Sequence, residues 1–220
     1  MKVEIWSDVV CPWCYIGKRR FEGALARFDH RDDVDVVWHS FELDPKAPRE
    51  QQGDLVTILA TKYGRSRAQA QSMLDNVTTT AAKDGLTYDL AHARGGNTLD
   101  AHRVIHLAGA HGKQGAAKER LLAAYFTERR PIADRDTLVA LGTDIGLDAT
   151  EVRTMLESDR FIDAVRADER EAAKLGVQGV PFFVIDRKFG VSGAQPVEVL
   201  LEAMQQAWSD AHPNGASASA

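Results

Sequence analysis

The sequence predicts an α/β fold whose sheet is assembled from the two ends of the chain. Near the N-terminus, a strand pattern is followed by a Cys-x-x-Cys motif, a helix pattern and a second strand pattern. Near the C-terminus, two short strand patterns precede another helix pattern. A chain of 220 residues with 44% hydrophobic content is large enough to bury the core of such a fold.

The N-terminal end has the pattern of a βαβ unit. Residues 2–6 alternate between polar and apolar, which is typical of a strand. Residues 33–41 are rich in Val, Trp and Phe and predict the second strand. Between these strands, apolar residues recur at helical spacing, at Tyr15, Ile16, Phe21, Leu25 and Phe28. The intervening helix is therefore expected to begin within the motif Cys11–Cys14.

The middle of the chain has a helical pattern. Two prolines interrupt the chain after the second predicted strand, and strand patterns are then missing from residues 46–174. Helices are expected around residues 97–111 and 113–128. Ser66 and Gln69 have the spacing of a capping box, which predicts that another helix begins there.

The C-terminal end completes the fold. Residues 180–185 predict a strand, residues 186–188 a turn, and residues 189–192 a strand that pairs back as a hairpin. Pro196 suits the first turn of a final helix that extends to about residue 207.

The β-α-β and β-β-α patterns are the two halves of a thioredoxin-like fold. We therefore predict a discontinuous thioredoxin-like domain formed by residues 1–45 and 175–210, with a large α-helical domain, residues 46–174, inserted between its halves. Residues 211–220 are small and polar, and predict a disordered tail.

Composition excludes several classes of partner. The formal net charge is −5, which disfavours a nucleic-acid partner because phosphate binding needs a positive surface. No apolar run approaches the roughly 18 residues of a membrane helix, so no membrane partner is expected. Residues 1–8 carry acids where a secretion signal would be apolar, which predicts a cytoplasmic protein if Met1 is the native start. The sequence does not indicate an oligomeric state.

The cysteine pattern predicts redox chemistry. The chain contains 2 cysteines, Cys11 and Cys14, in one Cys-Pro-Trp-Cys motif. A helix N-terminus stabilises a thiolate, so Cys11 is expected to have a lowered pKa and to attack disulfides, with Cys14 as the resolving thiol. Pro12 suits the first helical position, and Trp13 is a candidate to shape the substrate surface. The motif is also half of a zinc site, but structural zinc needs four ligands.

A proline near the C-terminus supports the same interpretation. In a βαβ–ββα sheet, the third strand runs antiparallel beside the first, so that its beginning lies next to the motif. Val180 and Pro181 stand there. A cis proline would leave the backbone of Val180 free to bind an extended substrate, whereas the simpler interpretation is a proline that marks a strand start.

Five stretches of the sequence resemble the DsbA family of thioredoxin-like proteins, and in particular its FrnE-like branch. They follow the order of the family and span nearly the whole chain. The matching stretches are Ser7–Gly17, Phe41–Pro45, Asn97–Arg103, Gly176–Phe183 and Ser192–Pro196.

The resemblance implies a thioredoxin domain interrupted by a helical domain that helps to form the substrate cleft. It also implies dithiol–disulfide exchange at Cys11 and Cys14 and a cis proline at Pro181. The partner would be a disulfide-containing protein or a small thiol; no metal or organic cofactor is required, and glutathione is a possible thiol co-substrate. Periplasmic relatives carry Pro-His within the motif, so the Pro-Trp dipeptide implies a less oxidising centre.

Two other functions remain open. Glutathione-dependent isomerases of 2-hydroxychromene-2-carboxylate and kappa-class glutathione transferases resemble this architecture, usually with a serine where Cys11 stands. A redox-inert binding or chaperone module is the second alternative, and function that survives Cys11→Ser would favour it.

Histidines provide one further candidate. His102 and His106 are four residues apart and can share a helix face, but no further metal ligands stand near them in the sequence. His102 falls within a family-like stretch and is a candidate for substrate binding near the cleft. His39, on the second predicted strand, is interpreted as structural.

Overall fold

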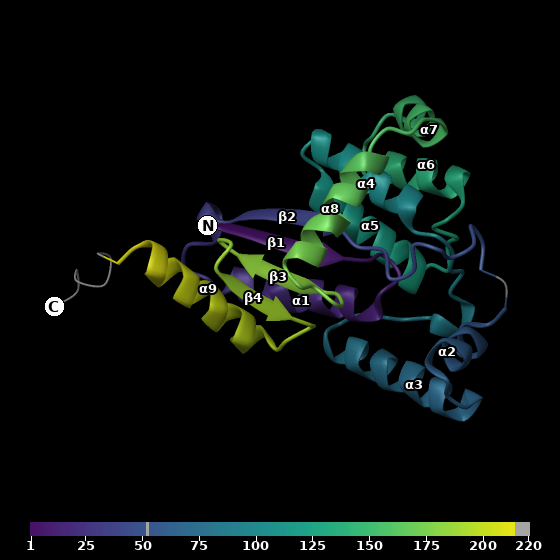
Figure 1. The fold of residues 1–220 in the computed structure, drawn as a ribbon, viewed down its shortest axis with the longest axis horizontal. Coiled ribbons are helices and arrows are strands. Elements are labelled where there is room, and N and C mark those ends of the chain that lie inside the picture. Colours follow the sequence, from purple (N-terminus) through teal and green to yellow (C-terminus); the bar gives the residue numbers. More distant parts are fainter. Residues whose placement is uncertain (52, 214–220) are drawn as a thin grey trace.

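The computed structural model describes residues 1–51 and 53–213, which form a mixed α/β fold (Figure 1). The strands of its sheet have the order β2-β1-β3-β4. β1 pairs parallel with β2 and antiparallel with β3, and β3 and β4 form an antiparallel hairpin. The strands are β1 (Lys2–Ser7), β2 (Asp35–Ser40), β3 (Phe182–Ile185) and β4 (Phe189–Ser192).

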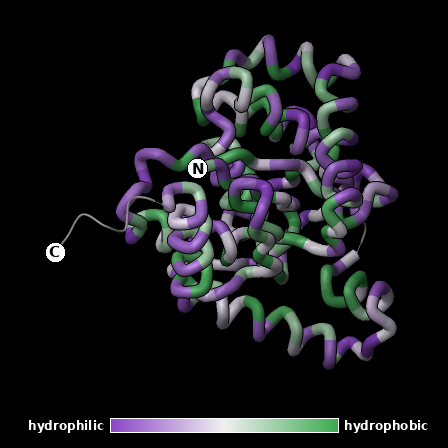
Figure 2. The backbone as a smooth tube through the Cα atoms, turned by 60° about the vertical axis from the view of Figure 1, so that its left-hand side comes forward, coloured by the Kyte–Doolittle hydropathy of each residue, from purple (hydrophilic) through white to green (hydrophobic). Residues whose placement is uncertain are grey.

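The helices cover the sheet and extend beyond one end of it. Along most of them, hydrophilic and hydrophobic residues alternate, as expected for helices packed on one side (Figure 2). The helices are α1 (Pro12–Ala26), α2 (Leu55–Tyr63), α3 (Arg67–Lys83), α4 (Leu99–Ala110), α5 (Gln114–Phe126), α6 (Arg135–Asp144), α7 (Ala149–Glu157), α8 (Ile162–Lys174) and α9 (Val197–Ala211).

The period of two along β1 separates the two faces of the sheet. Val3 and Ile5 are fully buried in a core that also contains residues of α1 and α9. Glu4 and Trp6 lie on the opposite face, which α8 covers, and Trp6 Nε1 donates to the carbonyl oxygen of Asp168 at 3.0 Å. The sheet is therefore the middle of three layers, with β1 in its interior.

The predicted fold class is confirmed, with small shifts at the ends of elements. The second strand begins at Asp35 because Arg31–Asp33 forms a 3-10 helix. β3 begins at Phe182, one residue after Pro181, which has no N–H to donate to a strand pair. The capping box of Ser66 and Gln69 is confirmed at the start of α3.

The helices of the middle of the chain pack in two different parts of the fold. Residues of α3 to α7 share a large apolar core with Tyr15 and Ile16 of α1, so the motif helix begins inside this core. α8 instead lies across the sheet, with Ala172 packed against Trp6. The boundaries proposed for the inserted domain stay a prediction, since α8 falls within residues 46–174 and yet forms one layer of the sheet sandwich.

The C-terminal prediction needs one correction. α9 extends to Ala211, beyond the predicted end near residue 207, because its apolar face continues to pack as far as Ala207 and Trp208. Residue 211 is thus helical and not part of a tail. Residues 214–220 of the predicted tail lie outside the described residues.

Candidate active site

Cys11 stands at the junction between β1 and α1. It has an extended backbone (φ −85°, ψ 114°) as the N-cap of α1, and Pro12 is the first helical residue. The N–H of Cys14 donates to the carbonyl oxygen of Cys11 at 3.0 Å, which closes the first turn. The helix therefore begins within the motif, as predicted, and places the two cysteines one turn apart.

Only one of the two thiols reaches the surface of the site. Cys11 is 4% exposed and lines a cavity of about 870 Å³, whereas Cys14 is fully buried behind it. Cys11 Sγ lies 3.4 Å from the carbonyl oxygen of Val180, to which it donates. Val180 and Pro181 are joined by a cis peptide bond, as the resemblance to the DsbA family implied. Cys11 and Val180, which are 169 positions apart in the sequence, are thus in contact through Cys11 Sγ.

The predicted site residues separate into two groups. Cys11, Pro12, Trp13 and Val180 line the cavity. Pro181 packs instead against α1, where a Cβ on Gly17 would lie 2.7 Å from Pro181 Cγ. This contact explains the glycine at position 17.

His102 also lies outside the cavity lining. It is 1% exposed, and its Nε2 lies 3.3 Å from Asp8 Oδ1. Asp8 Oδ2 accepts a hydrogen bond from the N–H of Leu43 at 2.8 Å, and Asp8 itself lines the cavity. Burial opposes the charge on Asp8, but His102 and the Leu43 N–H hold its pKa below the usual value. His102 therefore positions Asp8, and the predicted direct contact with substrate does not follow from this arrangement.

A buried lysine completes the site. Lys118 on α5 is 1% exposed, and its Nζ donates to the carbonyl oxygen of Ser7 at 3.1 Å. Burial lowers the pKa of Lys118 to about 8, although the charges of Cys14 and Asp8 oppose that change. An ammonium group from the helical region thus stands behind the cysteine pair.

The two thiols share their ionisation. The hydrogen bond with Cys14 and burial raise the pKa of the Cys11 thiol well above its usual value. Burial also opposes ionisation of Cys14, but the hydrogen bond from Cys11 and the Lys118 ammonium hold the Cys14 pKa below its usual value. The pair thus shares one negative charge between two interacting sulfurs, and the lowered pKa expected at Cys11 stays a prediction.

Sequence reasoning missed two residues of the site. Lys118 lies on the buried face of α5 together with Ala117, Leu121 and Leu122. A lysine on an otherwise apolar helix face is a sequence pattern that could have indicated a buried functional group. Tyr88 Oη donates to the carbonyl oxygen of Pro12 at 2.6 Å. Tyr88 belongs to a loop between helices, and no sequence pattern predicts this contact.

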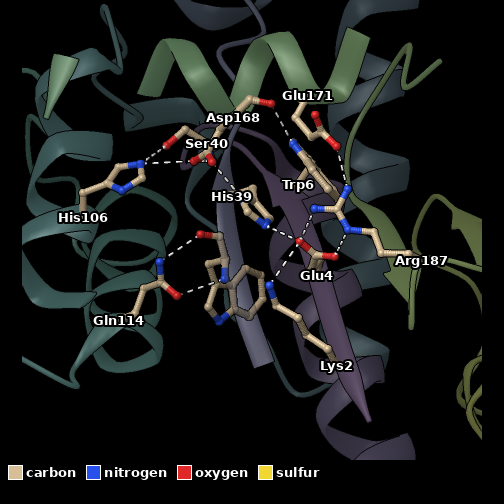
Figure 3. Close-up of polar contacts among 11 residues, drawn as sticks. Lys2, Glu4, Trp6, His39, Ser40, His106, Gln114, Asp168, Glu171 and Arg187 are labelled. Atoms are coloured by element: carbon tan, nitrogen blue, oxygen red, sulfur yellow. Dashed lines mark hydrogen bonds and ion pairs between the residues drawn. The ribbon is translucent and has the colours of Figure 1, made fainter. Parts of the chain in front are cut away.

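A second polar cluster joins the sheet to the helices around it (Figure 3). His39 Nδ1 lies 2.6 Å from Asp168 Oδ1, and His39 Nε2 lies 3.0 Å from Glu4 Oε1. His106 Nε2 lies 3.1 Å from both Ser40 Oγ and Asp168 Oδ2. A serine–histidine–aspartate triad needs the two ring nitrogens to have different partners, so this arrangement is not one. His39 thus has the structural position that the sequence predicted.

The described residues offer neither a metal site nor a membrane-spanning helix. In residues 1–51 and 53–213, no three or more His, Cys, Asp or Glu side chains gather in a way that could hold a metal ion. None of the helices found there combines the length and the apolar character needed to cross a membrane.

The fold and the site together define a thioredoxin-like protein with a Cys-Pro-Trp-Cys pair beside a cis proline. Comparison of the sequence with protein families matches residues 2–205 to the DSBA-like thioredoxin domain. The chain belongs to this family.

Three similar proteins place the chain more closely. A probable DsbA oxidoreductase of Streptomyces coelicolor is 50% identical, with a TM-score of 0.91 over 96% of this chain and 91% of that structure. The uncharacterized protein YwbO of Bacillus subtilis (strain 168) is 29% identical over 185 residues, 83% of this chain and 86% of YwbO. A 2-hydroxychromene-2-carboxylate isomerase is similar in fold alone, with 16% identity and a TM-score of 0.70 over 97% of this chain and 98% of its own.

Proposed function

We propose that the protein is a cytoplasmic thiol–disulfide oxidoreductase that exchanges disulfides with a protein or small thiol substrate through Cys11 and Cys14. One observation carries the proposal: the sulfur that lines the cavity belongs to Cys11, and the second sulfur lies directly behind it. The similarity to a probable DsbA oxidoreductase, at 50% identity, supports the same chemistry.

The reaction begins with attack by Cys11 on a substrate disulfide. Cys11 reacts as the thiolate, with the single negative charge of the pair on its sulfur and the proton on Cys14. Cys11 Sγ forms a bond with one substrate sulfur, and the other substrate sulfur leaves as a thiolate that takes up a proton. The product of this step is a mixed disulfide between Cys11 and the substrate.

The second step releases the substrate. The proton of Cys14 passes to the substrate thiolate that left in the first step, and the Lys118 ammonium stabilises the resulting Cys14 thiolate. The thiolate attacks Cys11 Sγ, a disulfide forms between Cys11 and Cys14, and the remaining substrate sulfur leaves reduced. Two electrons have then moved from the protein to the substrate, and an external dithiol must return them. The same steps in reverse oxidise a substrate dithiol.

Val180 supports the binding of an extended substrate. Its carbonyl oxygen accepts from the Cys11 thiol, and no hydrogen bond within the described residues engages its N–H. A substrate backbone that pairs with Val180 would bring its own half-cystine against Cys11 Sγ.

Reduction of insulin by dithiothreitol tests the proposal. We expect the native protein to accelerate the reaction and the Cys11→Ser variant to return it to the uncatalysed rate. A Cys14→Ser variant is the matched control, because it keeps the attacking sulfur and should accumulate a mixed disulfide that mass spectrometry detects.

Other outcomes would identify the alternatives. Equal, uncatalysed rates for the native protein and Cys11→Ser would contradict the proposal. Binding of glutathione that persists in Cys11→Ser, together with isomerisation of an aromatic substrate, would favour the isomerase function.

A further inference from the structure

One buried hydroxyl beside the cysteine pair has no hydrogen-bond partner. Within residues 1–51 and 53–213, the buried side-chain atoms that lack such a partner are Glu4 Oε2, Ser7 Oγ and Glu42 Oε1. The two carboxylates are nevertheless held by ion pairs, with Arg187 and Arg166 respectively. Ser7 is fully buried and, unlike them, carries no charge that an ion pair could stabilise. Its hydroxyl needs another explanation, because an unpaired buried polar group costs free energy of folding.

The position of Ser7 on β1 directs its side chain toward the cysteine pair. Side chains alternate between the two faces of a strand, and Val3 and Ile5 share a core with residues of α1, so Ser7 lies on the same face. Cys14 stands in the first turn of α1 and is fully buried. The carbonyl oxygen of Ser7 accepts a hydrogen bond from Lys118 Nζ at 3.1 Å. Ser7 thus lies beside both the resolving thiol and the ammonium.

The Ser7 hydroxyl takes part in the ionisation of Cys14. Burial opposes the Cys14 thiolate, whereas the hydrogen bond from Cys11 and the Lys118 ammonium favour it. The Ser7 hydroxyl adds to these two groups, so that the pKa of the Cys14 thiol stays below its usual value. The hydroxyl is within reach of the sulfur but forms no regular hydrogen bond with it in the reduced protein. A thiol is a weak acceptor and a thiolate a strong one, so ionisation of Cys14 supplies the missing partner.

We propose that Ser7 is a further catalytic residue, whose hydroxyl donates a hydrogen bond to the Cys14 thiolate while that thiolate resolves the mixed disulfide. This inference rests on the proposed disulfide exchange. In this step the Cys14 thiolate forms a bond with Cys11 Sγ, the bond from Cys11 to the substrate breaks, and the substrate sulfur leaves with the electron pair. In the reverse reaction Cys14 is the leaving thiolate, and the same hydrogen bond stabilises it.

A donor that waits for a transient charge favours the reaction at the expense of stability. Its hydrogen bond forms only while the charge is on Cys14, so it stabilises the reacting state and not the resting pair. Ser7→Ala removes an unpaired polar group, and we therefore expect the midpoint of urea denaturation of the reduced protein to stay the same or to rise. The step that Cys14 carries out should nevertheless become slower. A serine with a structural role alone would show the opposite pattern.

Titration of Cys14 tests the inference without any substrate. In a Cys11→Ser background, the ultraviolet absorbance of the thiolate follows the ionisation of Cys14 as the pH rises. A hydrogen bond to a charged group corresponds to a factor of about ten in the thiolate population. Ser7→Ala should therefore displace the titration curve to higher pH, whereas Ser7→Thr keeps a hydroxyl and should titrate close to the Cys11→Ser parent.

Rapid mixing with dithionitrobenzoate separates the two chemical steps, because each step releases one coloured thiolate. In Ser7→Ala the first release, which depends on Cys11, should not slow. The second release should slow by about threefold, since the smaller thiolate population at Cys14 is partly offset by its higher nucleophilicity.

Ser40→Ala is the matched control. Ser40 is paired with Ser7 in the register of the sheet and is also buried. Its hydroxyl already has a partner, His106 Nε2, at 3.1 Å. Loss of this hydroxyl should leave the titration of Cys14 and both releases of colour at their native values.

The possible results distinguish the inference from the proposed function. A titration curve and a second release that Ser7→Ala leaves unchanged would overturn the inference, and reduction of insulin by the native protein would then leave the proposed function intact. Equal displacement of the curve in Ser7→Ala and Ser40→Ala would also overturn it, because the effect would belong to the ends of the strands and not to the Ser7 hydroxyl. A native protein that does not reduce insulin would overturn the proposed function, and with it the catalytic role of Ser7, even if Ser7→Ala displaces the curve.

Discussion

Replacement of Lys118 by methionine is expected to make the protein more stable and a poorer catalyst. The pKa of Lys118 is about 8, compared with 10.5 for an ordinary lysine. This difference corresponds to about 3 kcal/mol by which burial disfavours the ammonium form in the folded protein. Loss of the hydrogen bond to the Ser7 carbonyl would offset about 1 kcal/mol of that gain. We expect the free energy of unfolding to rise by about 2 kcal/mol at pH 7.

The pH dependence provides a sharper measurement. Since the folded pKa of Lys118 lies below the unfolded value, the unfolded chain binds more protons between pH 8 and pH 10.5. Urea denaturation should therefore show that the native protein gains stability across this window and that Lys118→Met loses the gain. Lys83→Met, at an exposed position on α3, is the control and should keep the native pH dependence.

Catalysis should change in the opposite direction. Without the ammonium, the pKa of the Cys14 thiol rises, so less of it is thiolate at neutral pH. Resolution of the mixed disulfide should slow by about threefold for each unit of pKa, because the remaining thiolate is more nucleophilic. Rapid-mixing experiments should show a mixed disulfide that forms but resolves slowly. A variant that is less stable at pH 7 and resolves the intermediate at the native rate would refute this account of Lys118.

Three other perturbations follow from the structure. Gly17→Ala should lower the free energy of unfolding by about 1–3 kcal/mol, because its Cβ would lie 2.7 Å from Pro181 Cγ. Gly115→Ala is the control, since a Cβ has room there, and it should leave the free energy of unfolding unchanged or raise it. Urea denaturation measures both variants. Asp168→Asn should cost roughly 3 kcal/mol at pH 7, since Asp168 is paired with two histidines despite burial. The two histidines hold the pKa of Asp168 below its usual value, so the native protein should lose this stabilisation as the pH falls below about 4. In thermal denaturation, the melting temperature of Asp168→Asn should therefore fall less steeply with decreasing pH than that of the native protein. Equilibration with glutathione buffers should give a reduction potential more negative than roughly −120 mV, and a value at that level would contradict the role assigned to the Pro-Trp dipeptide.

The sequence predicted those parts of the site that depend on local patterns. The helix start at Pro12 and the pairing of Val180 with Cys11 follow from turn chemistry and from the pairing rules of a βαβ–ββα sheet. The sequence did not predict the role of Lys118, because its partner Ser7 lies 111 residues away in the chain. The two residues meet only where α5 packs near the end of β1. The charge of Lys118 on an apolar helix face was visible, but its partner was not.

The ionisation of the cysteine pair shows the same limit. A helix N-terminus favours a thiolate at Cys11, and this argument uses the sequence near the motif alone. The structure adds the second thiol and the ammonium behind it, and both take part in the ionisation of the pair. Local rules located the reactive group, whereas its protonation depends on residues brought together from several elements.

The long separation between Cys11 and Val180 has a consequence for the order of events during synthesis. Val180, whose carbonyl oxygen contacts Cys11, is translated 169 residues after it, which at ordinary rates of translation takes roughly 10 to 30 s. During that interval β1 has no β3 to pair with, and both thiols are open to any oxidant. Within the nascent chain an oxidant can join only Cys11 to Cys14, and this is the same disulfide that the proposed reaction forms.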